Sequence, residues 1–580
     1  MPRQPKDLAN KEARLLHWFT DAASKWSSWR DLAYRDRQYY EGQQWTDEEV
    51  SELKRLSQPV ITVNHIWSKV NSLVGMMLQQ QPTIKCLPRG SRDAVLASIA
   101  TAVIRYIFDI NQFNPALSDI MTDMLTTGVG WADVRINPFL SHDPILVEHV
   151  PFDEVIYDPL SRKTDFSDAR FVFRGRWIER DLVERHYPQA KNHIRELLKT
   201  HGGEQSFPSV PLQTFQWIDT TRDMVFVLEA QYRDFSTEEV VWDGVQAERY
   251  VPDLHDDLIA LGFLSRDVMT IPVVRRAVII ASKLILDEPL PYAFNSFTLV
   301  PFVAHRRLID GSPLSLVSIV KDIQDEINKR RSKTLHYLQA KRVIASHGAI
   351  QNKDDFMEEL RRPDAFLEVL NPDAVRIEDD LQLSAQHFTL MQEAVNELSL
   401  ISGIYPDFLG QPTNARTGAA LRVRILQSQN SVQRFFSALE RGLKQVAERV
   451  LALAKQYYTS ERVKQIVDIS SDLFPSRIDW QTDVPQIRNT LSALRADIVV
   501  KVAQGGFTER QEQLVQLVEL MKVLPPDLVA MSLDVIIDAF DLPQKEVIKA
   551  RLVQLIQIRA QMAQQTLTGG NGNGRGSEEA

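Results

Sequence analysis

Apolar residues recur every three or four positions along a long stretch that ends near residue 458, and this spacing is typical of an amphipathic helix. No proline occurs between Gly418 and Tyr458. At 1.5 Å per residue, such a helix is roughly 60 Å long, so it needs an equally long surface to pack on. The residues of the stripe are Leu421, Ile425, Ser428, Val432, Phe435, Leu439, Leu443, Val446, Val450, Leu453 and Tyr457.

The same period predicts helices in several other parts of the chain. The first, over residues 7–40, is rich in aromatic residues, and we interpret its aromatic face as packed on the protein body. Gly42 ends this helix, and Thr46 with Glu49 forms a capping box for the next one. Further ranges with this period are 92–128, 312–340, 385–402 and most of 480–566, and residues 59–84 read as a short strand followed by a helix that Pro82 closes. Ser312 and Pro313 are the expected N-cap and first helical residue of the helix at 312–340.

Between residues 131 and 304 the period changes to two, and β-branched residues are frequent, which predicts strands. A helix is expected there only at about 179–200. The expected strands are ILVEHV, ARFVFRGRWI, MVFVLEAQYR, EVVWDG, VVRRAVIIASKLILDE and TLVPFVAH. A small insertion at 341–384 reads as strand RVIAS, helix KDDFMEELRR and strand AFLEVL. The fold class predicted for the whole chain is therefore α+β.

Composition places the 580-residue chain among ordinary globular proteins, with 44% hydrophobic and 25% charged residues. The net charge of −9 argues against a protein that coats nucleic acid through a general basic surface. It is compatible with a smooth passage for DNA. Cys86 is the only cysteine, so no disulfide within the chain is expected. This composition predicts assembly in a reducing cytoplasm. No export signal or membrane-spanning stretch is predicted, and no internal repeat.

Sequence signatures of catalysis are not found. The chain has no GxxxxGK[ST] phosphate loop and no GxSxG, HExxH or CxxC motif. His142 and His149 flank a strand, and we favour a structural role over a metal site. The run DIQDEI at 322–327 contains Asp322, Asp325 and Glu326 among alternating charges, which is more typical of a solvated or subunit-contacting helix face than of a nuclease centre. We therefore predict no catalytic residue, cofactor or metal.

The order of elements then becomes informative. The helices at 312–340 and 385–402 are able to run as an antiparallel pair with the 341–384 insertion at its far end. One such stalk buries little surface and is poorly stable alone. Many stalks side by side in a ring of closed symmetry bury one another's faces.

In this order the chain resembles the portal proteins of tailed bacteriophages, most closely those of short-tailed podoviruses. Segments that carry the resemblance run collinearly over most of residues 35–545: YYEGQQWT, RLSQPVITVNHIWSKVNSLVGMMLQQQPTI, TTGVGWADVRI, VPFDEVIYDPLSRKTDFSDARFVFRGRWIERDLVERHYP, LPYAFNSFTLVPFVAHR, KDIQDEINKRRSKTLHYL, ISGIYPDFLGQ and ADIVVKVAQGGFTERQEQ. Each segment alone is a weak signal, and the specificity lies in their order.

The resemblance implies a dodecameric ring whose subunit has named parts. These are a wing at 1–311, stem helices at 312–340 and 385–402, a clip at 341–384, a tunnel-facing loop at 403–418, a wing spine helix and return at 419–479, a helical crown at 480–566 and a disordered tail at 567–580. The chain would bend inward between stem and spine, because this stretch contains four residues that interrupt helices: Pro406, Gly410, Pro412 and Gly418.

The resemblance also implies a function and partners. The ring would form the DNA channel at one capsid vertex, assembled in the host cytoplasm, for packaging by the terminase large subunit and for later ejection. Major capsid, scaffolding and tail adaptor or head-completion proteins would bind it, and double-stranded DNA would pass non-specifically. Candidate residues are Gln411, Thr413, Asn414, Arg416 and Thr417 in the tunnel loop, Lys329, Arg330 and Lys333 on the stem channel, and Lys353, Glu358 and Arg361 on the clip.

Two alternatives stay open at this point. One is a packaging enzyme, a terminase-like ATPase or nuclease, against which stands the missing phosphate loop. The other is an internal virion scaffold or tape-measure protein, against which stands the strand-rich section at 131–304.

Overall fold

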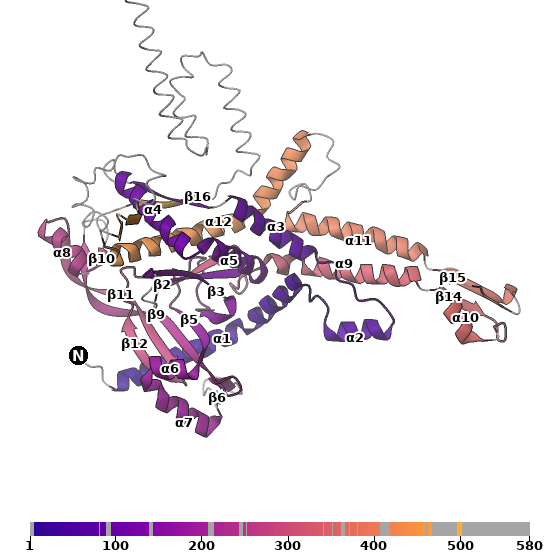
Figure 1. The fold of residues 1–580 in the computed structure, drawn as a ribbon, viewed down its shortest axis with the longest axis horizontal. Helices are drawn as coiled ribbons and strands as arrows, with labels where there is room; N and C mark the ends of the chain where they lie inside the picture. Colours follow the sequence, from indigo (N-terminus) through magenta and orange to yellow (C-terminus); the bar gives the residue numbers. More distant parts are fainter. Residues whose placement is uncertain are drawn as a thin grey trace, which may run out of the picture. The chain divides into compact units, whose positions relative to one another are not determined.

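A computed structural model of the chain describes residues 5–80, 82–88, 94–137, 143–202, 204–206, 214–242, 247–250, 252–339, 341–350, 352–360, 366–369, 372–379, 381–405, 418–459, 462–463, 465–466 and 496–501. The chain divides into two units, Met1–Ile466 with Trp480–Val502 and Val467–Asp479 with Ala503–Ala580. All described residues belong to the first unit (Figure 1). It contains both helices and sheets, so the α+β prediction is confirmed.

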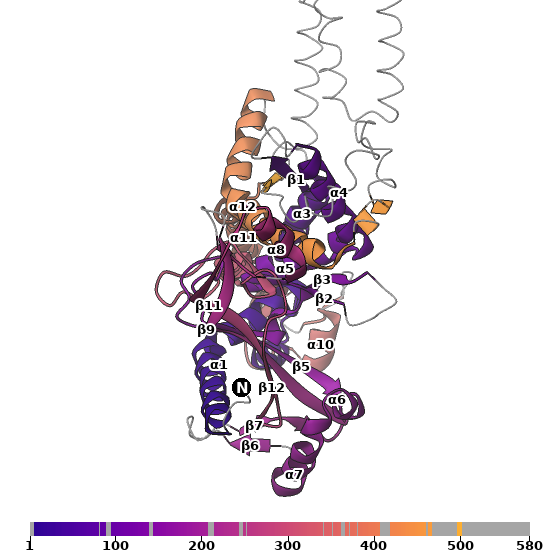
Figure 2. The ribbon, with the colours of Figure 1, turned by 90° about the vertical axis from the view of Figure 1, so that its left-hand side faces the viewer.

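The N-terminal helix α1 (Pro5–Glu41) lies along a seven-stranded antiparallel sheet with strand order β12-β11-β9-β5-β4, in which β8 (Ile218–Asp219) and β10 (Ala247–Arg249) also pair with β9 (Figure 2). The other strands are β4 (Val155–Tyr157), β5 (Phe171–Glu179), β9 (Met224–Trp242), β11 (Ser265–Ile280) and β12 (Lys283–Pro289). Trp18 stacks on Phe171, and Phe19 meets Phe173 edge to face. The aromatic face of α1 is therefore core, as predicted.

The structure differs from the prediction at three places in this region. The run 273–288, predicted as one strand, contains the end of β11, a turn and most of β12. The turn residues Ala281 and Ser282 both have positive φ, as the two central residues of a type I′ hairpin turn do. Alanine and serine rarely occupy such positions, so the sequence gives no sign of the turn. A helix, α8 (Pro252–Ala260), also interrupts the strands where none was expected. The predicted strands 224–233 and 239–244 are joined in the single strand β9.

A second sheet, of order β13-β2-β3, supports the long helix. Its strands are β2 (Val129–Ile136), β3 (Ile145–Val150) and β13 (Leu299–Val303). The helix α12 (Gly418–Tyr457) packs on it so closely that a Cβ atom at Gly442 would lie 2.2 Å from Phe302. Nη2 of Arg441 donates a hydrogen bond to the Val303 carbonyl, and the buried Arg449 donates through Nε to the Phe297 carbonyl over 2.7 Å. The long predicted helix thus has its supporting surface.

The remaining elements are mostly helical. They are α2 (Asp47–Arg55), α3 (His65–Gln80), α4 (Ala94–Ile110), α5 (Phe113–Thr127), α6 (Arg180–His186), α7 (Lys191–His201), α9 (Leu316–Gln339), α10 (Lys353–Glu359) and α11 (Leu381–Ser402), with strands β1 (Thr83–Pro88), β6 (Glu204–Ser206), β7 (Thr214–Gln216), β14 (Lys341–Ala345), β15 (Val375–Asp379) and β16 (Ala496–Lys501). β1 pairs with β16 across more than 400 residues of sequence, Thr83 with Lys501 and Pro88 with Ala496.

Helices α9 and α11 lie side by side, and the β14–β15 ribbon follows the end of α9 and precedes the start of α11 (Figure 1). The expected helix pair with an αβ insertion is therefore present in the chain. The second strand of the insertion is at Val375–Asp379, so the prediction of a strand at 365–370 is wrong: residues 366–369 lie in no strand, and the others of that range are outside the described residues. The N-cap of α9 is Ser315, whose Oγ accepts from the Ser318 amide over 2.8 Å, and not Ser312, because Pro313 forms a bridge with Arg306 before the helix begins.

Candidate functional site at the stem helices

An extended segment, residues 59–64, runs along α9, and we call it the strap. Its polar contacts alternate: the amides of Ile61 and Val63, and that of His65 where α3 begins, donate to side chains of α9. The acceptors are Ser332 Oγ at 3.3 Å, Asn328 Oδ1 at 2.9 Å and Gln324 Oε1 at 3.2 Å. Two residues of extended chain rise about 6.6 Å and four residues of helix about 6.0 Å, so the two ladders stay in register.

This geometry corrects the prediction of a strand in the strap. The backbone is extended, as its β-branched residues indicate, but its hydrogen-bond partners are helix side chains and not another strand. Asn328 also donates from Nδ2 to Gln44 Oε1 over 2.6 Å, and Gln324 donates from Nε2 to the Val63 carbonyl over 2.7 Å. All three α9 side chains are buried. The strap, the turn after α1 and the middle of α9 are thereby held as one unit.

Other polar side chains of α9 are also occupied. The buried carboxylate of Asp36 on α1 accepts from Ser315 Oγ over 2.7 Å and pairs with Lys321 over 3.0 Å. Asp325 accepts from the Tyr39 hydroxyl over 2.7 Å. Burial raises the pKa of Asp325, although the Tyr39 hydrogen bond opposes this. The acidic run at 322–327 is thus partly used to attach α9 to α1.

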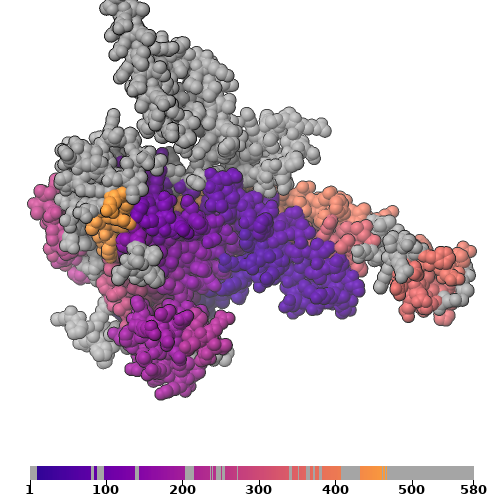
Figure 3. Space-filling model, viewed as in Figure 1, coloured from indigo at the N-terminus to yellow at the C-terminus, as the bar shows by residue number. Residues whose placement is uncertain are grey.

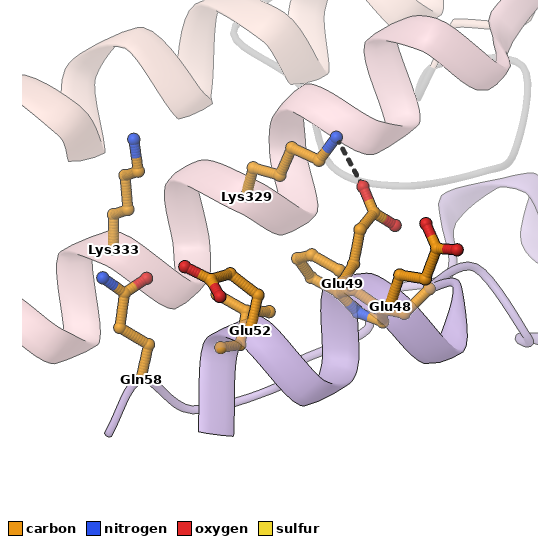
Figure 4. A pocket seen from close by; sticks show the side chains of 8 residues that line it. Glu48, Glu49, Glu52, Gln58, Lys329 and Lys333 are labelled. Atoms are coloured by element: carbon orange, nitrogen blue, oxygen red, sulfur yellow. Dashed lines mark ion pairs between the residues drawn. The ribbon is translucent and has the colours of Figure 1, made fainter. Parts of the chain in front are cut away.

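A groove lies between α2 and α9 (Figure 4). The capping box of α2 is present as predicted: the Glu49 amide donates to Thr46 Oγ1 over 3.2 Å, and Glu49 Oε2 accepts from the Thr46 amide over 3.1 Å. Glu49 also pairs with Lys329 across the groove over 3.0 Å. Burial favours protonation of Glu49, but the Thr46 and Lys329 contacts outweigh it and hold the pKa of this carboxyl below its ordinary value.

The groove has a cavity volume of about 420 Å³, within the usual range of roughly 300–1,000 Å³ for ligand pockets. Trp45 and Leu53 supply its apolar wall, and the carboxylates of Glu48, Glu49 and Glu52 line its α2 side. Glu52 also pairs with Arg55 on α2. Sequence reasoning found the helix from its capping box and missed the groove, because the lysines that close it are about 280 residues away in sequence.

Two of the three stem residues predicted for the channel form ion pairs within the chain. Lys329 pairs with Glu49, and Arg330 pairs with Glu326 one turn earlier on α9. Lys333 is exposed and lines the groove (Figure 4). Whether these residues face a channel stays a prediction.

Among the residues predicted for the clip and the tunnel loop, the structure describes only two. Lys353 and Glu358 are exposed on α10, as predicted from helix polarity. Arg361 lies outside the described residues, and so do Gln411, Thr413, Asn414, Arg416 and Thr417.

The end of α11 next to that loop is held by a buried lysine that sequence reasoning did not single out. Lys69 of α3 donates to Ser399 Oγ over 3.1 Å and to the Ile404 carbonyl. Burial lowers its pKa to about 8. The signal available in the sequence was a single lysine on the apolar face of a predicted helix.

Candidates for metal or catalytic chemistry have structural partners instead. His149 Nε2 lies 2.8 Å from Asp123 Oδ2, and His142 is outside the described residues. In the described part of the chain, no group of three or more His, Cys, Asp or Glu side chains is placed to hold a metal ion. None of the described helices combines the length and the apolar character that a membrane crossing needs.

Comparison with known proteins identifies one family. A family model described as phage P22-like portal protein matches residues 16–568. The search of curated proteins found no match. Among solved structures, a chain from the virion of a native gene transfer agent (GTA) particle is similar over 72% of this chain and 89% of its own length, with 8% sequence identity and a TM-score of 0.30. At these values the structural likeness adds no weight to the family match.

Proposed function

Because the chain belongs to the family of phage P22-like portal proteins, we propose that it assembles into a closed, dodecameric ring that forms the DNA channel at one capsid vertex. The family match confirms the resemblance found in the sequence. Portal proteins are structural, non-enzymatic components of the phage virion, so the prediction that the chain is not an enzyme is also confirmed.

The observation that carries the ring proposal is an exposed apolar stripe on α11. Leu383, Leu390 and Ile401 are all at least two-fifths exposed. Their spacings of seven and eleven residues place them on one face of the helix. At the tip of the pair, Ile344 and Ile377 are exposed on a two-stranded ribbon, which is marginal in water by itself. Neighbouring copies of the same pair would cover these surfaces in a ring.

In this proposal the parts of the portal follow the bounds of the elements. The stem is α9 with α11, the clip is β14, α10 and β15, and the wing comprises the two larger sheets, α1 and the spine helix α12. Residues 403–418 would face the tunnel and 480–566 would form the crown; most of both ranges lies outside the described residues.

The proposed partners follow from this arrangement. The terminase large subunit and later the tail adaptor or head-completion proteins would dock at the clip, where Lys353 and Glu358 are exposed. Major capsid and scaffolding proteins would surround the wing during assembly in the host cytoplasm. DNA would bind Lys329, Arg330 and Lys333 only weakly, because Glu49 and Glu326 already neutralise two of these cations. Each cation that is free to contact a phosphate adds salt-dependent affinity for DNA.

The test is a negative-stain image of the purified protein together with its mass in light scattering. Rings with a central hole and a mass many times 66.3 kDa are expected. Leu390→Lys should reduce the ring fraction, because it places a charge in the apolar stripe, whereas Gln392→Lys on another exposed face of α11 should not. A stable monomer at micromolar concentration would contradict the proposal.

A further inference from the structure

Buried polar atoms without a hydrogen-bond partner lie beneath one surface loop, residues 158–170, which we call the cover loop. Tyr157 is 1% exposed, and its hydroxyl has no partner among the described residues. The same holds for Nε and Nη2 of Arg306 and for Nε of Arg233. Buried polar groups nearly always have partners in native proteins, so these four atoms require an explanation. Each of them carries a hydrogen, so the partner that would satisfy them is an acceptor.

The cover loop is closed and rigid. Its ends meet because Asp158 accepts from Arg170 Nε over 2.7 Å and from Arg170 Nη2 over 2.8 Å. Within the loop, Asp168 accepts from the Ser161 hydroxyl and from the Arg162 amide, each over 2.7 Å. A loop fixed in this way leaves the side chains beneath it little freedom to reach solvent.

Phe166, a buried residue of the cover loop, lies against two of the unpartnered groups. Its ring meets the Tyr157 ring edge to face with 4.6 Å between centroids, and the guanidinium carbon of Arg306 lies 4.3 Å from its centroid. Arg306 Nη1 already donates to the Ser161 carbonyl over 2.8 Å. Nε and Nη2 form the other edge of the guanidinium group, where two N–H bonds point in parallel. This is the edge that receives an anion in bidentate contacts.

The buried arginines around this place lack counter-charges. Arg233 on β9, Arg306 after β13 and Arg449 on α12 have no ion-pair partner among the described residues. The charge of Asp165, an exposed residue of the cover loop, acts on all three, which places them around one region. Burial lowers the pKa of each arginine, so each carries its charge at a cost in free energy. A water molecule would satisfy the donors only, whereas an anion would also offset the charge.

We propose that a small monovalent anion such as chloride binds between Tyr157 and Arg306 beneath the cover loop. The hydroxyl and the free edge of the guanidinium group would donate to it, and Arg233 would add its charge. Tyr157 ends β4, and Arg306 belongs to the turn before α9, the helix whose far half projects from the unit in Figure 3. An anion held there would stabilise the junction between the seven-stranded sheet and α9. The proposal does not depend on ring formation.

Thermal unfolding in chloride and in methanesulfonate, a bulkier monovalent anion, tests the site at equal ionic strength and one protein concentration. The unfolding temperature of the wild type should rise and then saturate as chloride replaces methanesulfonate, because a ligand of the folded state stabilises it. Tyr157→Phe should weaken the apparent chloride affinity by about tenfold or more, because it removes one hydrogen bond to a charged group. Arg306→Met should abolish the chloride response.

The matched control is Tyr232→Phe, at another buried tyrosine, whose hydroxyl donates to Asp287 over 2.8 Å. It should lower the stability equally in both salts and keep the chloride response. Chloride-35 NMR gives a direct readout: the line broadening caused by the wild type should decrease in Tyr157→Phe and not in Tyr232→Phe.

Two results would overturn the anion site. One is a wild-type chloride response in Tyr157→Phe, which would place any bound chloride elsewhere. The other is a wild type that unfolds at the same temperature in both salts. If Tyr157→Phe is then less stable than the wild type in both salts, the hydroxyl is satisfied by a bound water molecule instead.

Discussion

Lys69 shows how one residue links the helix bundle to the segment proposed to reach the tunnel. Its ammonium group is buried and donates to Ser399 and Ile404 at the end of α11. Among the described residues, no carboxylate pairs with it, and burial alone lowers its pKa to about 8. His65, one turn earlier, also has a lowered pKa, first through burial and then through the charge of Lys69. The lysine is therefore charged at neutral pH at a cost in free energy, offset in part by its two hydrogen bonds.

This cost predicts a specific pH dependence. Between about pH 8 and about pH 10.5, the unfolded chain still binds the Lys69 proton while the folded chain has released it, so raising the pH favours the folded state. The free energy of unfolding of the wild type, measured against Lys69→Met, should rise by at most about 1.4 kcal/mol per pH unit in this window. Below pH 8 the difference should be flat. Denaturant unfolding at a series of pH values measures it, and a flat difference throughout would show that the lysine has its ordinary pKa.

At this scale the sequence predicts local signals better than partners. The Thr46–Glu49 capping box was predicted and is present, because both of its partners lie within four residues. The cap of α9 was placed at Ser312 instead of Ser315. The Ser-Pro pair was a strong local signal, but the bridge between Arg306 and Pro313 continues the preceding turn and delays the helix.

At the scale of elements, the strap is the clearest case of a structure that sequence periodicity describes only in part. Its extended backbone was predicted, but the ladder of Gln324, Asn328 and Ser332 that receives it was not. These residues are four apart on α9, and polar residues at that spacing normally indicate a solvated face. Likewise, the turn between β11 and β12 was missed because Ala281 and Ser282 give no turn signal. In each case the deciding contacts are tertiary.

The strap makes a stability prediction. Asn328→Ala should lower the free energy of unfolding by about 1–3 kcal/mol, because it leaves the Val63 amide and the Gln44 amide oxygen without their buried partner. Arg331→Ala, at an exposed position of the same helix, should stay within about 0.5 kcal/mol of the wild type. Both are measured by thermal unfolding at one protein concentration, since a ring makes stability depend on concentration. Equal stability of the two variants would show that the ladder contributes nothing.

At the scale of the whole molecule, the order of elements carried the most information. The pair α9–α11 with its insertion, the strand-rich section and the long helix were all predicted in sequence order, and the family match over residues 16–568 confirms what that order resembles. The groove between α2 and α9 was not predicted, because no local pattern brings Trp45 and Glu52 to Lys333. The exposure of Leu308 and Ile309 was not predicted either, because apolar residues such as these are usually buried.

The last prediction concerns the segment between α11 and α12. Residues 406–417 lie outside the described residues, and their role as a tunnel-facing loop stays a prediction from the sequence and the family. DNA of any sequence must pass, so the loop should meet phosphates and not base edges. Contacts must also be weak, since each Lys or Arg contact adds affinity that would slow movement. A single cation, Arg416, beside neutral Asn414 and Thr417 suits such a sliding contact.

The test replaces residues 411–416 with a shorter glycine linker and measures ring assembly and packaged DNA separately. Rings should form as in the wild type, because the stem contacts are unchanged, and the amount of DNA retained in heads should fall. The variant Arg416→Gln keeps the length of the loop and removes only its charge, so it should retain more DNA than the linker variant. Intact rings with full heads and normal DNA retention in the linker variant would instead show that the segment only connects α11 to α12.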